Sequence, residues 1–173
     1  MKTQFTIATM LGLLLGAATL TKAATQETAL QTTKKGPVMT AQANGTFDVK
    51  VKPLPEDEKV PGVTVGRMSI DKQWKGDIEG TSKGEMMTAG TPVKGSAGYV
   101  AVEVVTASIK GRRGTFTFLH NATMKQDGDF NMGIKVIPDS GTGQLVGLTG
   151  ALTIIIEGGK HSYKFDYTLP EVK

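Results

Sequence analysis

Hydrophobic and polar side chains alternate along most of this chain with a period of two, beginning near residue 44. In the segment 47–52, for example, Phe and Val alternate with Asp and Lys, which is typical of a β-strand with one buried face. No window shows the 3.6-residue stripe of an amphipathic helix. The expected strands are 44–52, 63–74, 76–88, 99–109, 115–125, 130–137, 152–156 and 162–169.

Turn-forming residues separate these segments, so we expect the strands to be joined as hairpins. The segment 53–62 holds three prolines, which cannot continue a hydrogen-bonded ladder. Short glycine turns are expected at 111–114 and 158–160, and a longer glycine-punctuated connection at 138–150. The pattern predicts an all-β fold, a single antiparallel eight-stranded closed barrel, with a two-sheet sandwich as the alternative.

Two features favour the barrel. Gly80, Gly84 and Gly133 lie inside expected strands, where glycine permits sharp coiling at a barrel corner. In the segment 99–105 both sets of alternate residues are mostly apolar. An outer face of that kind is expected where a neighbouring subunit covers it, so the pattern also suggests a homo-oligomer.

The N-terminal residues resemble a secretory signal. A basic start is followed by the apolar segment 5–20 and by Thr21-Lys22-Ala23-Ala24, which predicts cleavage after Ala23. The alternative is an uncleaved anchor. We therefore divide the chain into a signal peptide (1–23), a flexible leader (24–42) and a β-barrel domain (43–173), and we expect an exported protein, periplasmic or secreted.

Composition limits the classes of partner and cofactor that we expect for this protein. The chain of 173 residues has no cysteine and two histidines, which excludes disulfides and leaves little for a metal site. After cleavage its bases and acids nearly balance and alternate, so we expect no nucleic-acid partner, and no membrane partner once the signal is removed. We expect no cofactor. The segment 80–84 fits the G-x-S-x-G pattern of a hydrolase, but a strand follows it instead of a helix.

The most informative candidate is His120, which shares the apolar face of its strand with Phe116 and Phe118. Pairing about a turn at 111–114 would place His120 opposite Val105 and diagonal to Glu103. A Glu–His pair inside an apolar barrel is either a core contact that fixes the register or a polar spot suited to chemistry. The candidate ligand-binding residues are Trp74, Tyr99, Glu103, Phe116, Phe118 and His120; no catalytic residue is assigned.

Five segments resemble a bacterial family described as domain of unknown function 3224. They occur in one order along the chain at 76–82, 95–103, 114–120, 138–145 and 160–165. The resemblance implies an antiparallel barrel similar to that of allene oxide cyclase, which binds a fatty-acid epoxide in its barrel and closes a ring. None of that enzyme's residues can be transferred to numbered positions here, and the family has no settled activity.

Three functions remain open. The first is binding of a small apolar or amphipathic molecule inside the barrel, which a filled interior would exclude. The second is a structural or interaction module that forms an oligomer through the outer barrel face. The third is an isomerase or lyase that uses Glu103 or His120 for proton transfer.

Overall fold

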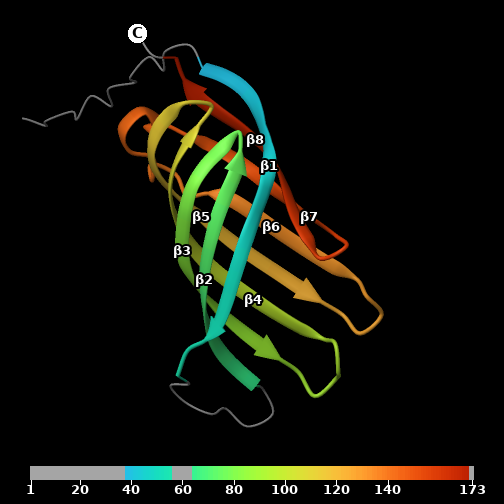
Figure 1. Ribbon diagram of the computed structural model, residues 1–173. Coiled ribbons are helices and arrows are strands. Elements are labelled where there is room, and N and C mark those ends of the chain that lie inside the picture. The colour runs from blue at the N-terminus through green and yellow to red at the C-terminus, as the bar shows by residue number, and fades with distance from the viewer. Residues whose placement is uncertain (1–37, 56–63, 172–173) are drawn as a thin grey trace, which may run out of the picture. The chain divides into compact units, whose positions relative to one another are not determined.

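The eight expected strands are all present, and they close into one antiparallel barrel (Figure 1). This computed structural model describes residues 38–55 and 64–171. Each strand pairs with the next in the chain, and β1 also pairs with β8, which closes the barrel. The predicted fold class is therefore confirmed. The strands are β1 (Val38–Pro53), β2 (Thr64–Gly76), β3 (Ile78–Gly90), β4 (Ala97–Ile109), β5 (Arg112–Met124), β6 (Phe130–Val136), β7 (Thr149–Glu157) and β8 (Lys160–Pro170).

The expected signal peptide (1–23) and most of the expected leader lie outside the described residues. Strand β1 begins at Val38, however, so residues 38–42 belong to the barrel and not to a leader. These residues pair with the end of β8, from Val38 opposite Pro170 to Gln42 opposite Asp166. The pairing partner is more than 120 residues away in the chain, so local composition could not indicate that the strand begins as early as Val38.

The turn between β4 and β5 differs from the expected one. Ile109 pairs with Arg112, so the turn consists of Lys110 and Gly111, which have φ angles of 47° and 86°. Two positive φ angles are typical of a two-residue hairpin turn. His120 consequently lies opposite Ala101 and not opposite Val105. The shift is an even number of residues, so every side chain stays on its expected face.

Arg112 also differs from the usual solvated arginine at a hairpin tip. Its guanidinium donates hydrogen bonds to the carbonyl oxygens of Pro170 (2.9 Å) and Gln144 (2.8 Å). These bonds join the start of β5 to the end of β8 and to the β6–β7 connection. Arg112 thus belongs to the closed end of the barrel.

Two of the three strand glycines occupy places where a side chain would clash. A Cβ atom at Gly80 or Gly84 would lie 2.3 Å from a carbonyl oxygen of β4, that of Thr106 or Val102. Glycine at these positions lets β3 approach β4 closely, as expected at a barrel corner. Gly133 is different, because the three atoms nearest to a Cβ there all belong to the side chain of Asn121, the closest being Oδ1 at 2.7 Å. The corner role expected for Gly133 stays a prediction.

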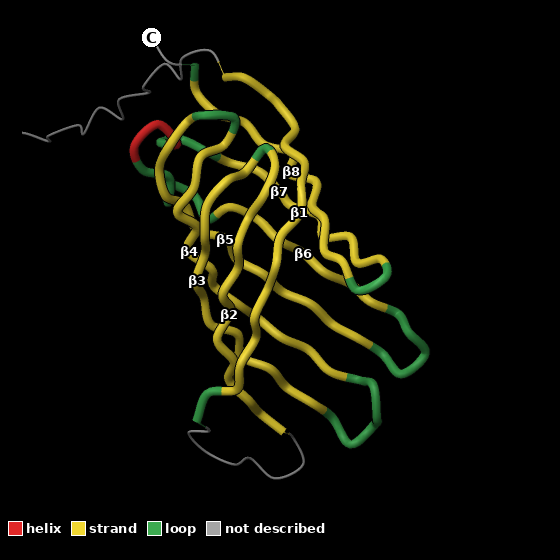
Figure 2. The backbone as a smooth tube through the Cα atoms, in the orientation of Figure 1, coloured by secondary structure: helices red, strands yellow, loops and turns green. Residues whose placement is uncertain are grey.

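The connection between β6 and β7 closes one end of the barrel. It includes the 3-10 turn η1 (Gly143–Leu145), the helical segment in Figure 2. Leu145 and Leu148 of this connection are fully buried. Below them lies a packed aromatic layer in which the rings of Phe116 and Phe165 stack 6.2 Å apart.

Within the described part of the chain, no helix is long and apolar enough to cross a membrane.

Candidate functional site

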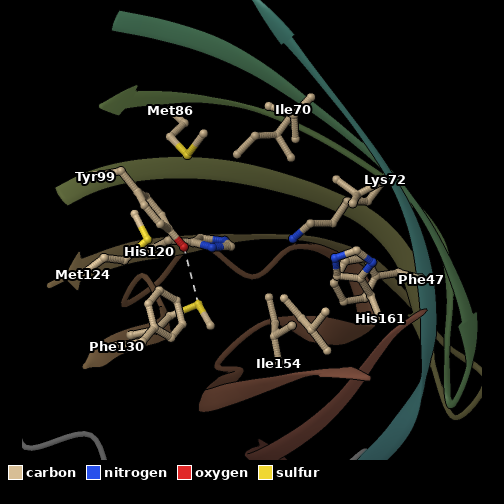
Figure 3. Close-up of a pocket in the computed structure, with 14 residues that line it drawn as sticks. Phe47, Ile70, Lys72, Met86, Tyr99, His120, Met124, Phe130, Ile154 and His161 are labelled. Carbon is tan, nitrogen blue, oxygen red and sulfur yellow. Dashed lines mark hydrogen bonds between the residues drawn. The ribbon is translucent and has the colours of Figure 1, made fainter. Parts of the chain in front are cut away.

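The half of the barrel farthest from η1 holds a cavity of about 280 Å³. Exposure of the inward side chains rises along each strand toward that end: on β6, Ile134 is buried, Met132 half-buried and Phe130 exposed. The same order holds for Leu152, Ile154 and Ile156 on β7. The cavity therefore has a buried floor and an exposed apolar rim. Figure 3 shows the side chains that line it.

The floor of the cavity adjoins a network of four buried polar side chains. Nζ of Lys72 donates a hydrogen bond of 2.8 Å to Oε2 of Glu103. Nε1 of Trp74 donates to Oγ of Ser82 at 2.9 Å, and Ser82 donates in turn to Oε1 of Glu103. Nε2 of His120 lies 2.8 Å from Oε2 of Glu103, although its N–H is not aligned for a hydrogen bond. Both carboxylate oxygens are thus engaged.

Glu103 stays ionised over the ordinary pH range. Its side chain is completely buried, and burial alone would raise the pKa of the carboxyl. The contact with His120 and the positive charge of Lys72 outweigh burial, and together they lower the pKa of Glu103 to about 2. A carboxyl with such a pKa is a permanent anion near neutral pH. It is therefore a poor proton donor.

Lys72 and His120 face both the network and the cavity. Nζ of Lys72 also lies 4.8 Å from the ring centre of Phe47 and 5.0 Å from that of Trp74, distances at which an aromatic face attracts a cation. Nδ1 of His120 makes no hydrogen bond with the described residues. In Figure 3 both side chains reach into the cavity from opposite walls.

The six candidate residues predicted from the sequence separate into two groups. Tyr99 and His120 line the cavity, and Glu103 lies behind His120 and Lys72. The hydroxyl of Tyr99 donates to Sδ of Met132 at 3.4 Å, and burial raises the pKa of this phenol. The remaining candidates, Trp74, Phe116 and Phe118, are buried side chains that do not line the cavity.

Lys72 and Ser82 belong to the polar network but are not among the candidates predicted from the sequence. Both carried a usable signal, because Lys72 shares its strand face with Ile70 and Trp74, and Ser82 shares a face with Ile78. Alternation therefore directs both polar side chains inward. The G-x-S-x-G pattern draws attention to Ser82 only as a hydrolase serine, whereas the structure places it as the hydrogen-bonded link between Trp74 and Glu103.

The arrangement limits the chemistry that the site can perform. His120 and His161 both line the cavity, and imidazole is the side chain most often used to move a proton in catalysis. Glu103 can orient His120 and Lys72 but is shielded from any bound molecule. No group of three or more histidine, aspartate or glutamate side chains that could hold a metal ion occurs in residues 38–55 and 64–171.

Comparison with known proteins identifies the family. A protein of unknown function from Shewanella oneidensis, itself a DUF3224 protein of known structure, is 42% identical. It has a TM-score of 0.72, and the match covers 78% of this chain and all of that one. A search of curated proteins found no match. The profile of the family described as "Protein of unknown function (DUF3224)" matches residues 43–167, and the chain therefore belongs to the DUF3224 family.

Proposed function

We propose that this protein binds one small apolar or amphipathic molecule in the hollow half of its barrel. The observation that supports this proposal is the cavity of about 280 Å³, which has apolar walls and a buried polar floor. Ligand pockets are commonly mostly apolar, with a few polar groups that orient the ligand. The exposed apolar rim, including Phe130 and Ile156, supports the same proposal because a bound molecule would cover it.

A pair of neighbouring residues on β7 provides a direct test. Ile154 is half-buried and lines the cavity, whereas the next residue, Ile155, is exposed on the outer face. Ile154→Trp should fill the cavity and abolish binding of the neutral fluorescent probe N-phenyl-1-naphthylamine. Ile155→Trp adds the same group outside the barrel and should bind the probe as the unchanged protein does.

Native mass spectrometry of the protein purified from its own cells would supply the second readout. We expect a bound small molecule that is retained by Ile155→Trp and absent from Ile154→Trp. Equal probe binding by both variants, or no binding by the unchanged protein, would contradict the proposal.

The outer face supports a second candidate, self-association. Met87, Val100, Val102 and Leu119 are exposed, and the register places them side by side on β3, β4 and β5. Such a patch suits a second copy of the chain, since an isologous dimer would bury it twice. We expect a dimer by sedimentation and a monomer for Val102→Lys. A monomeric unchanged protein would exclude this candidate.

A further inference from the structure

The charges around the cavity indicate which polar group its ligand carries. The described side chains that line the cavity include Lys72, His120 and His161, and none of these described side chains is an aspartate or glutamate. Most of the remaining lining is aliphatic, methionine or aromatic. Among these residues a bound cation would therefore find no partner of opposite charge.

The carboxylate that contacts Lys72 and His120, that of Glu103, does not line the cavity. Glu103 is fully buried, Ser82 occupies its Oε1, and Lys72 and His120 both contact its Oε2. Its negative charge thus contacts Lys72 and His120 on the side of these two groups that faces away from the cavity. A molecule in the cavity would therefore meet the basic side chains of Lys72 and His120 and not the carboxylate of Glu103.

Lys72 retains unused donor capacity there. An ammonium has three hydrogens, and Nζ donates one hydrogen bond, to Glu103, within the described part of the chain. The faces of Phe47 and Trp74 provide the other close partners, at 4.8 and 5.0 Å. The side chain is buried, so solvent compensates this ammonium poorly. A negatively charged oxygen in the cavity would satisfy the remaining hydrogens.

His120 is placed to contact the same oxygen. Its Nε2 and Nζ of Lys72 each lie 2.8 Å from one atom, Oε2 of Glu103, so the two basic groups are close together. When its ring is protonated, Nδ1 of His120 becomes a second donor. We infer that the ligand is an organic anion, an apolar body with a single carboxylate-like head held between Lys72 and His120. This inference rests on the proposed ligand-binding function.

Three compounds that share a naphthalene ring system and differ in the charge of their polar group test the inference on the unchanged protein. They are naphthalene-2-carboxylate, the neutral 2-naphthamide and the cationic 2-(aminomethyl)naphthalene, titrated by isothermal calorimetry at neutral pH. A charge-assisted hydrogen bond in a buried site should favour the carboxylate over the amide by about tenfold or more. The amine should bind most weakly.

A double variant then assigns the preference to Lys72. Lys72→Met alone would leave Glu103 as an unpaired buried charge and could prevent folding. The variant Lys72→Met/Glu103→Gln removes both charges and keeps a hydrogen-bond acceptor for Ser82. It should bind carboxylate and amide about equally, with little change in the affinity for the amide. Lys83→Met, an exposed lysine on the outer face of β3, is the matched control and should keep the full preference.

The outcomes separate this inference from the proposed function. Equal or tighter binding of the amide or amine to the unchanged protein would overturn the anionic head and leave the binding cavity intact. A carboxylate preference that survives in the double variant would overturn the role of Lys72. Failure of all three compounds and of N-phenyl-1-naphthylamine to bind would overturn both. If the double variant does not fold by circular dichroism, the ranking in the unchanged protein decides.

Discussion

The two halves of this barrel are built from the same strands but differ in what fills them. Near η1, inward aromatic and aliphatic side chains such as Phe116, Phe118 and Leu145 are completely buried. Toward the other end the inward side chains are mostly apolar, yet they surround a cavity and become exposed at the rim. Because the hydrophobic effect rewards burial, the packed half should supply most of the stability. The hollow half is the part in which we propose that a ligand binds.

The polar network lies where the two halves meet. Lys72 and Glu103 sit between the aromatic core and the cavity floor, and their charges are matched inside the barrel. Breaking such a pair is costly, although an intact pair need not stabilise a fold strongly. The comparison therefore suggests that the network orients polar groups toward the cavity more than it holds the barrel together.

The largest expected effect distinguishes two phenylalanines. Phe118 is fully buried, with its ring centre 5.0 Å from that of Phe116 and 5.5 Å from that of Phe165. Phe118→Ala should lower the free energy of unfolding by about 3–5 kcal/mol, because it opens a void in the packed half. Phe130→Ala at the exposed rim should change it by less than about 1 kcal/mol. Urea denaturation measures both values, and similar losses would refute the division into a packed and a hollow half.

Acid should lower the free energy of unfolding, because it protonates Glu103 in the network where the two halves meet. The pKa of Glu103 is lowered from 4.5 to about 2 in the folded protein, so the unfolded chain takes up the proton first as the pH falls. The stabilisation that follows from this lowered pKa is fully present above about pH 4.5 and is lost as the pH falls from there to 2. The pKa difference corresponds to about 3 kcal/mol.

Urea denaturation at several pH values between neutrality and pH 2 measures this loss. Glu103→Gln should flatten the acid limb of the curve. Glu85→Gln, which alters an exposed carboxylate paired with Arg67, serves as the control and should leave the curve almost unchanged. An acid limb that persists in Glu103→Gln would show that other carboxylates cause it.

The smallest expected difference concerns two tyrosine hydroxyls. In the packed half, the hydroxyl of Tyr163 accepts a 2.8 Å hydrogen bond from the backbone N–H of Ile78, and burial raises its pKa to about 12. Tyr163→Phe leaves that buried N–H without an acceptor and should cost about 1–3 kcal/mol. The hydroxyl of Tyr99 donates to a sulfur, a weak acceptor, so Tyr99→Phe should cost less than about 0.5 kcal/mol. Equal costs by thermal or urea unfolding would contradict the comparison.

Alternation along the chain was sufficient to predict the strands and the faces of their side chains. His120, Glu103 and Tyr99 were expected to point inward, and all three do. The register expected for β4 and β5 is wrong, because glycine at both ends of 111–114 suggests a four-residue turn. In the barrel Arg112 is held in β5 by bonds to Pro170 and Gln144, which lie far from it in the sequence.

The sequence by itself determined the eight strands, their antiparallel order and which residues face the barrel axis, because a period of two is a local property of the chain. Only the tertiary structure decided which half of the interior is filled and which is hollow. That depends on the connection with Leu145 and Leu148 closing one end, and on Lys72 and Ser82 meeting Glu103 across three strands. Such contacts join residues distant in the chain, so no local pattern contains them.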